Sequence, residues 1–306
     1  MITAIIFFCF FAAVQILQYT GQKDKLHRAY TGACPPPEVL PSEILLHGKD
    51  LVLTIQEIDS ILKKRFKYYA LLEKNLQERF IKRLHRFMLK KTFIIKDDEG
   101  FKEMPVLVSA AAIGLTFGLK DFRLAFYKYI RIYPEEYISE NCFKVLAGNV
   151  QDNIITIAWN HLLKGYNDFT DGSNVGLHEM SHALYIQKIV IEHNYANRFL
   201  KKYNYLVNEC RQAYNMEVEG KKNFYSEYAD SDLQEFWAES VELFFEKPLE
   251  FNHHYQDVYK ALKLLLNQDP LNKAYPLLES SLPYNKKLLK IIRLLRNRII
   301  PGNSFN

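Results

Sequence analysis

Three residues near the middle of the chain have the types and spacing of a metal-dependent hydrolase: His178, Glu179 and His182. Positions i and i+4 of a helix lie one turn apart on the same face, so both imidazoles can bind one metal ion. A zinc ion held in this way lowers the pKa of a bound water to about 7. The glutamate beside the first histidine can then take a proton from that water, and this chemistry hydrolyses peptide bonds without a covalent intermediate.

The residues around this motif are typical of a helix that packs against a core. Residues 171–174 form a polar loop that ends in good helix N-cap residues. Neither proline nor glycine interrupts the chain from Leu177 to His193, and apolar residues recur there at helical spacing. We therefore expect the two histidines to project from a helix that is anchored in the core.

A third protein ligand has to come from a later part of the chain. The metzincin pattern requires a glycine and a third histidine where this sequence has Tyr185 and Lys188, so that pattern is excluded. Residues 232–246 predict a second helix, in which glutamates alternate with large apolar residues. Glu235 and Glu239 share a helix face, so one could bind the metal while the other orients a histidine. Spacing alone does not choose among the four candidates, which are Glu235, Glu239, Glu242 and Glu246.

Two longer stretches resemble a known family. The first runs from Asp171 to His182 and reads Asp-Gly-x-Asn-x-x-Leu-His-Glu-x-x-His. The second runs from Tyr228 to Phe245 and reads Tyr-Ala-x-x-Asp-x-x-Glu-Phe-x-Ala-x-x-x-Glu-x-Phe-Phe. Together they resemble the MtfA family of zinc-dependent, gluzincin-like peptidases. Weaker similarity upstream extends the resemblance over roughly residues 60–250.

The resemblance implies roles for particular side chains. In that family two histidines and a downstream glutamate bind zinc, and the corresponding residues here are His178, His182 and Glu235. Glu179 corresponds to the general base, and Tyr228 corresponds to a tyrosine that stabilises the oxyanion. Glu242 matches a recurring glutamate to which the resemblance assigns no role.

The composition is that of a folded enzyme. The 306 residues are 48% hydrophobic, which is enough for a sizeable core, and the four cysteines lack the paired spacing of a disulfide framework. The net charge of +5 is modest, and basic residues concentrate between Lys286 and Arg298 on a predicted amphipathic helix. A solvated face or an anionic membrane surface explains this cluster better than nucleic acid does. The sequence contains no base-reading motif, so we expect no nucleic-acid partner.

The first residues predict a membrane anchor. Ile2 to Tyr19 carry no charge, and these eighteen residues would span about 27 Å as a helix, just enough for a thin hydrocarbon core. The positive charge and the small-x-small cleavage site that mark a signal peptide are both missing. Basic residues follow from Lys23 onward, so the positive-inside rule places the catalytic part in the cytoplasm. We expect an uncleaved single-pass anchor in a bacterial inner membrane, whereas the resembled family is usually soluble and cytosolic.

Three segments are expected along the chain: an anchor at 1–20, a tether at 21–50 and a zinc peptidase domain at 51–300. The tether contains the proline-rich residues 34–41, which are stiff and extended because proline fixes its own φ and restricts the preceding residue. The domain begins with apolar residues at helical spacing from Leu51 onward.

The domain sequence predicts a mainly helical α+β fold of the zincin type, with a small sheet packed over the HExxH helix. Further helical patterns run over 71–89, 255–266 and 288–299. Runs rich in β-branched and aromatic residues predict short strands over 92–96, 126–133 and 154–159. We expect the last of these to be an edge strand beside the active-site cleft, because extended peptides bind by adding to such an edge.

These features predict a zinc-dependent peptidase that hydrolyses peptide or protein substrates with a metal-activated water. The resemblance also implies an alternative of a different class, because MtfA proteins capture a transcriptional repressor of glucose uptake. In that alternative the chain is a regulatory binding protein that sequesters a partner, and its zinc is structural or vestigial.

Overall fold

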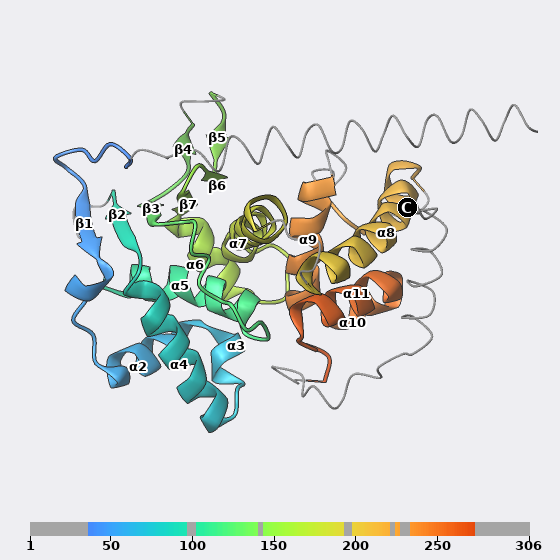
Figure 1. The fold of residues 1–306 in the computed structure, drawn as a ribbon, viewed down its shortest axis with the longest axis horizontal. Helices are drawn as coiled ribbons and strands as arrows, with labels where there is room; N and C mark the ends of the chain where they lie inside the picture. Colours follow the sequence, from blue (N-terminus) through green and yellow to red (C-terminus); the bar gives the residue numbers. More distant parts are fainter. Residues whose placement is uncertain are drawn as a thin grey trace, which may run out of the picture.

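The arrangement of the elements places one helix at the centre of the molecule. That helix is α7 (Val175–Tyr185), which carries the HExxH motif. A sheet and helices α2 to α6 lie on one side of it, and helices α8 to α11 lie on the other side (Figure 1). The computed structural model describes residues 36–96, 102–139, 143–192, 198–220, 224–226 and 233–272.

The main sheet has five strands in the order β1-β2-β3-β7-β6. Its three inner strands run parallel to one another, while the two edge strands, β1 and β6, run antiparallel to their neighbours. A short hairpin pairs β4 with β5 outside this sheet. The strands are β1 (Ile44–His47), β2 (Thr92–Ile95), β3 (Tyr129–Tyr133), β4 (Tyr137–Ile138), β5 (Val145–Leu146), β6 (Gly148–Gln151) and β7 (Ile154–Ala158).

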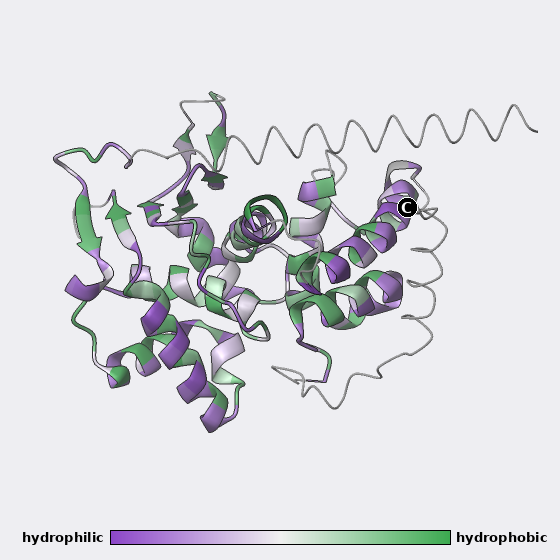
Figure 2. Cartoon of the chain, in the orientation of Figure 1, coloured by the Kyte–Doolittle hydropathy of each residue, from purple (hydrophilic) through white to green (hydrophobic). Residues whose placement is uncertain are grey.

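Helices make up most of the described fold. Helix α5 is buried along nearly its whole length, since small and aliphatic residues cover all its faces, as is typical of a central helix. Hydrophilic and hydrophobic stripes alternate on α4 and α11, which lie at the surface (Figure 2). The helices are η1 (Gly48–Asp50), α2 (Ile55–Arg65), α3 (Lys67–Ala70), α4 (Lys74–Met88), α5 (Glu103–Thr116), α6 (Trp159–Asn167), α7, the π-helical turn η2 (Ile186–Ile191), α8 (Arg198–Val218), α9 (Leu233–Glu246), α10 (Pro248–His254) and α11 (Gln256–Leu266).

Helix α7 is held from several sides at once. It contacts β6 and β7 of the sheet, the central helix α5, and α9. Gly176 lets α7 approach its neighbours closely, because a Cβ there would lie 2.6 Å from a methyl group of Leu162 and 3.1 Å from the Cβ of Ala111. Trp237 of α9 donates a hydrogen bond from Nε1 to the carbonyl oxygen of Ser181 at 3.1 Å. These contacts fix α7 and α9 relative to each other.

The expected fold class is confirmed in its main features. The structure is α+β, mainly helical, with a small mixed sheet against the HExxH helix. One prediction about the sheet is wrong: the strand expected at the edge, β7, lies inside it between β3 and β6. The edge beside α7 is formed by β6 instead. Four of the five residues of β7 are fully buried, which is typical of an inner strand.

The N-terminal segments are only partly described by the structure. Strand β1 lies within residues 21–50, which the sequence assigns to the tether, and it pairs with β2. Part of that segment therefore belongs to the sheet. Among the residues that the structure describes, no helix is both long and apolar enough to cross a membrane. The predicted anchor at 1–20 and the predicted helix at 288–299 lie outside the described residues, so both stay predictions.

Candidate metal centre

Three of the residues singled out in the sequence meet where α7 and α9 face each other. Nε2 of His178 lies 3.1 Å from Nε2 of His182 and 3.0 Å from Oε2 of Glu235. Nε2 of His182 is 3.4 Å from Oε1 of Glu235. Within the described part of the chain, this is the one group of three or more His, Cys, Asp or Glu residues whose ligand atoms all lie within 4.8 Å of one another.

The three side chains are close enough to share one metal ion. Bonds of about 2.0–2.1 Å at tetrahedral angles separate ligand atoms by about 3.3 Å. The two imidazole nitrogens are 3.1 Å apart, and Glu235 directs Oε2 to His178 at 3.0 Å and Oε1 to His182 at 3.4 Å. The two imidazole nitrogens face each other and the carboxylate of Glu235. A metal cation bound between these groups would accept a lone pair from each of them.

Glu242 holds His178 from the other side of its ring. Its Oε1 lies 2.7 Å from Nδ1 of His178, and because a carboxylate only accepts, Nδ1 carries the proton. In the neutral ring, the lone pair of Nε2 then faces His182 and Glu235, which is the tautomer that a metal ligand requires. The sequence suggested Glu239 for this role, and that suggestion is wrong. Glu239 instead accepts hydrogen bonds from the backbone N and Oγ of Ser226, at 2.6 and 2.7 Å.

Asn174 connects the start of α7 to the carboxylates of α9. Its side-chain Oδ1 accepts a hydrogen bond from the backbone N of Leu177 at 3.1 Å, which confirms the expected N-cap. Its backbone N donates to Oε2 of Glu242, and its Nδ2 donates to Oε1 of Glu246 at 2.9 Å. From the sequence, Asn174 was expected only to cap the helix. The only hint in the sequence that Asn174 also helps to position the candidate ligands is that it lies four residues before His178.

Glu179 lies beside the three-residue group without being part of it. Its side chain is buried, with 6% of its surface exposed, and it faces the edge strand β6. A Cβ at Gly148 would lie only 2.6–2.9 Å from the Cγ, Oε1 and carboxyl carbon of Glu179. Glycine at this position therefore leaves the space that the carboxylate occupies. The arrangement brings a buried base, a potential metal site and the edge strand of the sheet together.

Comparison with known proteins agrees with this geometry. The sequence model of the family described as glucose-regulated metallo-peptidase M90 matches residues 53–266, which is well over half of the chain. The chain belongs to this family. The resemblance to MtfA-type peptidases is thus confirmed, and membership of the family implies a hydrolase that depends on a metal ion. A comparison with curated proteins found no match.

The imidazoles and carboxylates of this metallo-peptidase shift one another's pKa values. Burial lowers the pKa of His178, but contacts with Glu235 and Glu242 outweigh it and raise that pKa well above the usual value. Burial raises the pKa of Glu235, yet hydrogen bonds to both histidines hold it far below its usual range. Burial also raises the pKa of Glu242, and here it prevails over the opposing effect of His178. Protons and a metal ion therefore compete for Nε2 of His178.

The predicted oxyanion residue of the metallo-peptidase, Tyr228, lies outside the described residues. Its neighbours at 224–226 are described and lie against α9. The ring of Tyr225 stacks on that of Phe236 at a centroid distance of 4.1 Å, and its hydroxyl group forms a hydrogen bond with Oγ of Ser240 at 2.8 Å. The role of Tyr228 stays a prediction.

Proposed function

We propose that this metallo-peptidase binds zinc through His178, His182 and Glu235 and hydrolyses peptide bonds with water as the nucleophile. The observation that carries the proposal is the convergence of His178, His182 and Glu235, whose ligand atoms lie within 4.8 Å of one another, with the first histidine oriented by Glu242. Two neutral imidazoles and one carboxylate are a usual ligand set of zinc peptidases and leave one coordination position open. When bound there, zinc would polarise the scissile carbonyl group and lower the pKa of water to about 7.

Glu179 is assigned the proton transfers. It follows His178 on α7, so its carboxylate lies next to the ligand group while its own oxygens are not part of it. The carboxylate would accept a proton from the attacking water and return it to the leaving amine. Burial raises the pKa of Glu179 although the two nearby imidazoles oppose the shift. A raised pKa brings the group closer to the working pH, where both halves of this transfer are feasible.

The edge strand β6 is assigned the binding of an extended substrate. It is the outermost strand of the main sheet on the side of α7, and its first residue, Gly148, lies against Glu179. A peptide that adds to this edge by backbone hydrogen bonds would pass directly over the proposed base. Tyr228 is assigned a donor hydroxyl for the negative charge that develops on the carbonyl oxygen.

The test compares the full-length protein with its Glu179→Gln variant. Zinc content is measured by atomic absorption, and cleavage is measured on an unfolded protein substrate. We expect one zinc per chain in both proteins, because Glu179 is not a ligand, and a rate of cleavage about 10²–10⁴-fold lower in the variant. Glu250→Gln removes an exposed carboxylate from α10 and serves as the control with unchanged activity.

Each outcome of this test has a definite meaning. Zinc in both proteins with cleavage in the parent and the control alone would support the proposal. Zinc in both proteins without cleavage in any of them would favour the alternative, a binding protein that sequesters a regulatory partner. A parent protein that cleaves its substrate after complete removal of zinc would contradict the proposed mechanism.

A further inference from the structure

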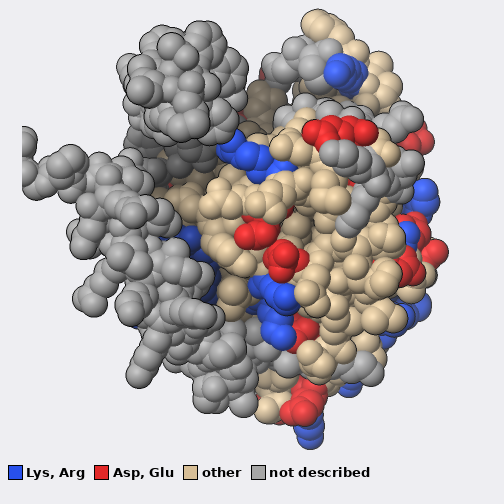
Figure 3. All heavy atoms as spheres, turned by 90° about the vertical axis from the view of Figure 1, so that its right-hand side faces the viewer, with Lys and Arg blue, Asp and Glu red and all other residues tan. Residues whose placement is uncertain are grey.

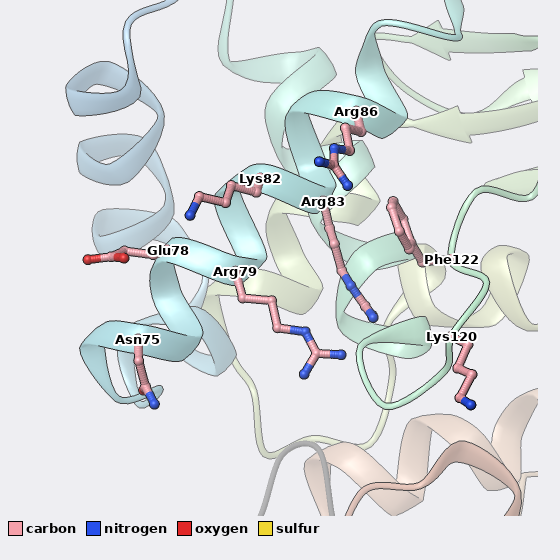
Figure 4. Close-up of a pocket in the computed structure, with 8 residues that line it drawn as sticks. All are labelled: Asn75, Glu78, Arg79, Lys82, Arg83, Arg86, Lys120 and Phe122. Carbon is pink, nitrogen blue, oxygen red and sulfur yellow. The ribbon is translucent and has the colours of Figure 1, made fainter.

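A basic cavity lies between α4 and the loop that follows α5 (Figure 4). Its volume is about 460 Å³, and a second hollow of about 530 Å³ adjoins it along the same loop. The side chains of Arg79, Arg83 and Lys120 end around the same space (Figure 4). The one carboxylate that lines the first cavity, Glu78, points away from that space (Figure 4).

The positive charges of the cavity are not neutralised by the protein around them. Among the described residues, no carboxylate lies within ion-pair distance of Arg79, Arg83 or Lys120. The nearest loop carboxylate, Asp121, is already paired with Lys188 at 2.8 Å and with Arg123 at 3.0 Å. The cavity therefore presents a net positive charge to whatever enters it.

Arg83 is built into the wall of this cavity. Only 9% of its surface is exposed, and its Nη1 donates a hydrogen bond to the carbonyl oxygen of Phe117 at 2.7 Å. Its guanidinium group lies over the rings of Phe117 and Phe122, at 5.6 and 4.7 Å from their centroids. Burial, and then the nearby charge of Arg79, lower the pKa of Arg83 to about 10. The guanidinium group of Arg83 is therefore still charged at neutral pH, and a bound anion would stabilise that buried charge.

The loop that forms the opposite wall is fixed in place. Lys188 of η2 holds Asp121, and the side chain of Gln187 accepts a hydrogen bond from the backbone N of Phe126 at 2.8 Å. The buried amine of Lys91 donates to the carbonyl oxygen of Leu124 at 2.7 Å. Because these contacts do not involve the cavity cations, this wall of the cavity is held by the protein alone.

The concentration of charge in this cavity differs from one other face of the molecule. On the face at the right-hand side of Figure 1, acidic and basic side chains are interspersed (Figure 3). A volume of about 460 Å³ falls within the range of about 300–1,000 Å³ that small-molecule pockets occupy. Lys82 and Arg86 also line this cavity, and basic residues continue into the adjoining hollow. The side chains of Arg79, Arg83 and Lys120 end around one space, which is the arrangement of a site for a single small anion.

We propose that this cavity binds the phosphate group of a small soluble ligand through Arg79, Arg83 and Lys120. The planar guanidinium group of arginine can form bidentate hydrogen bonds with two oxygens of a phosphate group. The three cations are enough to neutralise the double negative charge of a phosphate monoester. The ring of Phe122 offers a flat apolar wall to the remainder of such a ligand. None of these residues takes part in the proposed metal centre.

The test is isothermal titration calorimetry of the full-length protein with inorganic phosphate at low salt. The variant Arg79→Gln/Lys120→Gln removes two cavity cations that lie at the surface and leaves the buried Arg83 in place. Lys64→Gln/Lys201→Gln removes two exposed cations elsewhere and is the matched control. We expect phosphate to bind at least about ten-fold more weakly to the cavity variant. The control should change by less than about two-fold.

Three results would overturn the proposal. Equal affinity of all three proteins would place the bound phosphate elsewhere, for instance at the metal centre, and equal losses in both variants would show an effect of net charge alone. Vesicles of phosphatidic acid provide the second probe, read as the difference between the two variants. Vesicle binding that depends on the cavity cations, in a protein that does not bind free phosphate, would make the cavity a lipid headgroup site and overturn the assignment to a soluble ligand.

Discussion

The two helices that form the candidate metal centre contribute to it in different ways. Helix α7 supplies three functional side chains within five consecutive residues, His178 to His182, and their roles follow from helical spacing. Helix α9 carries four carboxylates on one face, spread along its length, and each meets different surroundings. Glu235 faces both histidines, Glu239 bonds to Ser226, Glu242 holds the ring of His178, and Glu246 bonds to Asn174.

The difference shows that spacing fixes a helix face but not the partner that each residue on that face will meet. At 100° per residue, Glu242 follows Glu235 by two turns and lies within about 20° of the same line along α9. Glu239 is displaced by about 40° from that line. The ring of His178 bridges the two aligned carboxylates through its two nitrogens. Substituting each glutamate in turn can therefore separate their roles.

The largest effect is expected for Glu235→Ala. Among the described residues, this change removes the one carboxylate that contacts both histidines, so the proposed zinc site is left with two of its three protein ligands. We expect loss of zinc from the purified protein and loss of peptidase activity, measured by metal analysis and substrate cleavage. Full zinc occupancy in this variant would instead make Glu242 the third ligand, since it is the other carboxylate in contact with His178.

A smaller effect is expected for Glu242→Gln. One oxygen of Glu242 holds Nδ1 of His178 and the other accepts from the backbone N of Asn174, whereas glutamine has a single acceptor oxygen. One of the two contacts is therefore lost, and the histidine ring is less well oriented. We expect zinc affinity to fall by about 10–100-fold, measured by competition with a chelator. An unchanged affinity would show that α7 alone orients the ring.

The role of Glu242 also marks the limit of what the sequence could predict. The HExxH spacing and the capping residue Asn174 are local features, and the structure places both as expected. The choice among the glutamates of α9 depends on how α9 crosses α7, which is set by packing contacts such as that of Trp237 with Ser181. No local pattern contains that information.

The sheet shows the same limit. The strand at 92–96 was predicted almost to the residue, because β-branched and aromatic residues favour strands locally. The order of the strands was not predictable from such preferences. Strand β6 has the polar sequence Gly-Asn-Val-Gln, which gives little sign of a strand, and it is held in the sheet by pairing with β7. A continuous apolar run, as in β7, is in retrospect the sign of an inner strand.

The variant Glu246→Gln is expected to change how stability depends on pH. Burial raises the pKa of Glu246 to about 8 from its usual 4.5, against the hydrogen bond from Asn174, and its Oε2 has no hydrogen-bond partner among the described residues. Between pH 4.5 and about pH 8, the carboxyl group of Glu246 has lost its proton in the unfolded chain but keeps it in the folded chain. The free energy of unfolding therefore falls as the pH rises through this window.

Glutamine does not titrate, so the variant should lack this part of the pH dependence. We expect the stability of Glu246→Gln relative to the parent to increase from pH 5 to pH 8.5, measured by urea unfolding at both pH values. Replacing the carboxyl group by an amide changes the free energy of unfolding by the same amount at both pH values. This contribution therefore cancels when the two differences between variant and parent are compared. An identical difference at both values would show that Glu246 ionises normally in the folded protein.

The smallest effect is expected for Glu239→Gln, which changes one of the glutamates that the sequence offered for orienting a histidine. Its half-buried side chain bonds only to Ser226 among the contacts described, so zinc affinity should change by less than about two-fold. Stability should fall by less than about 1 kcal/mol in urea unfolding. Ser226→Ala should produce a similar loss, and the double variant should lose less than the sum because both changes remove the same contact. A ten-fold loss of zinc affinity in Glu239→Gln alone would return this glutamate to the metal centre and displace Glu242 from its assigned role.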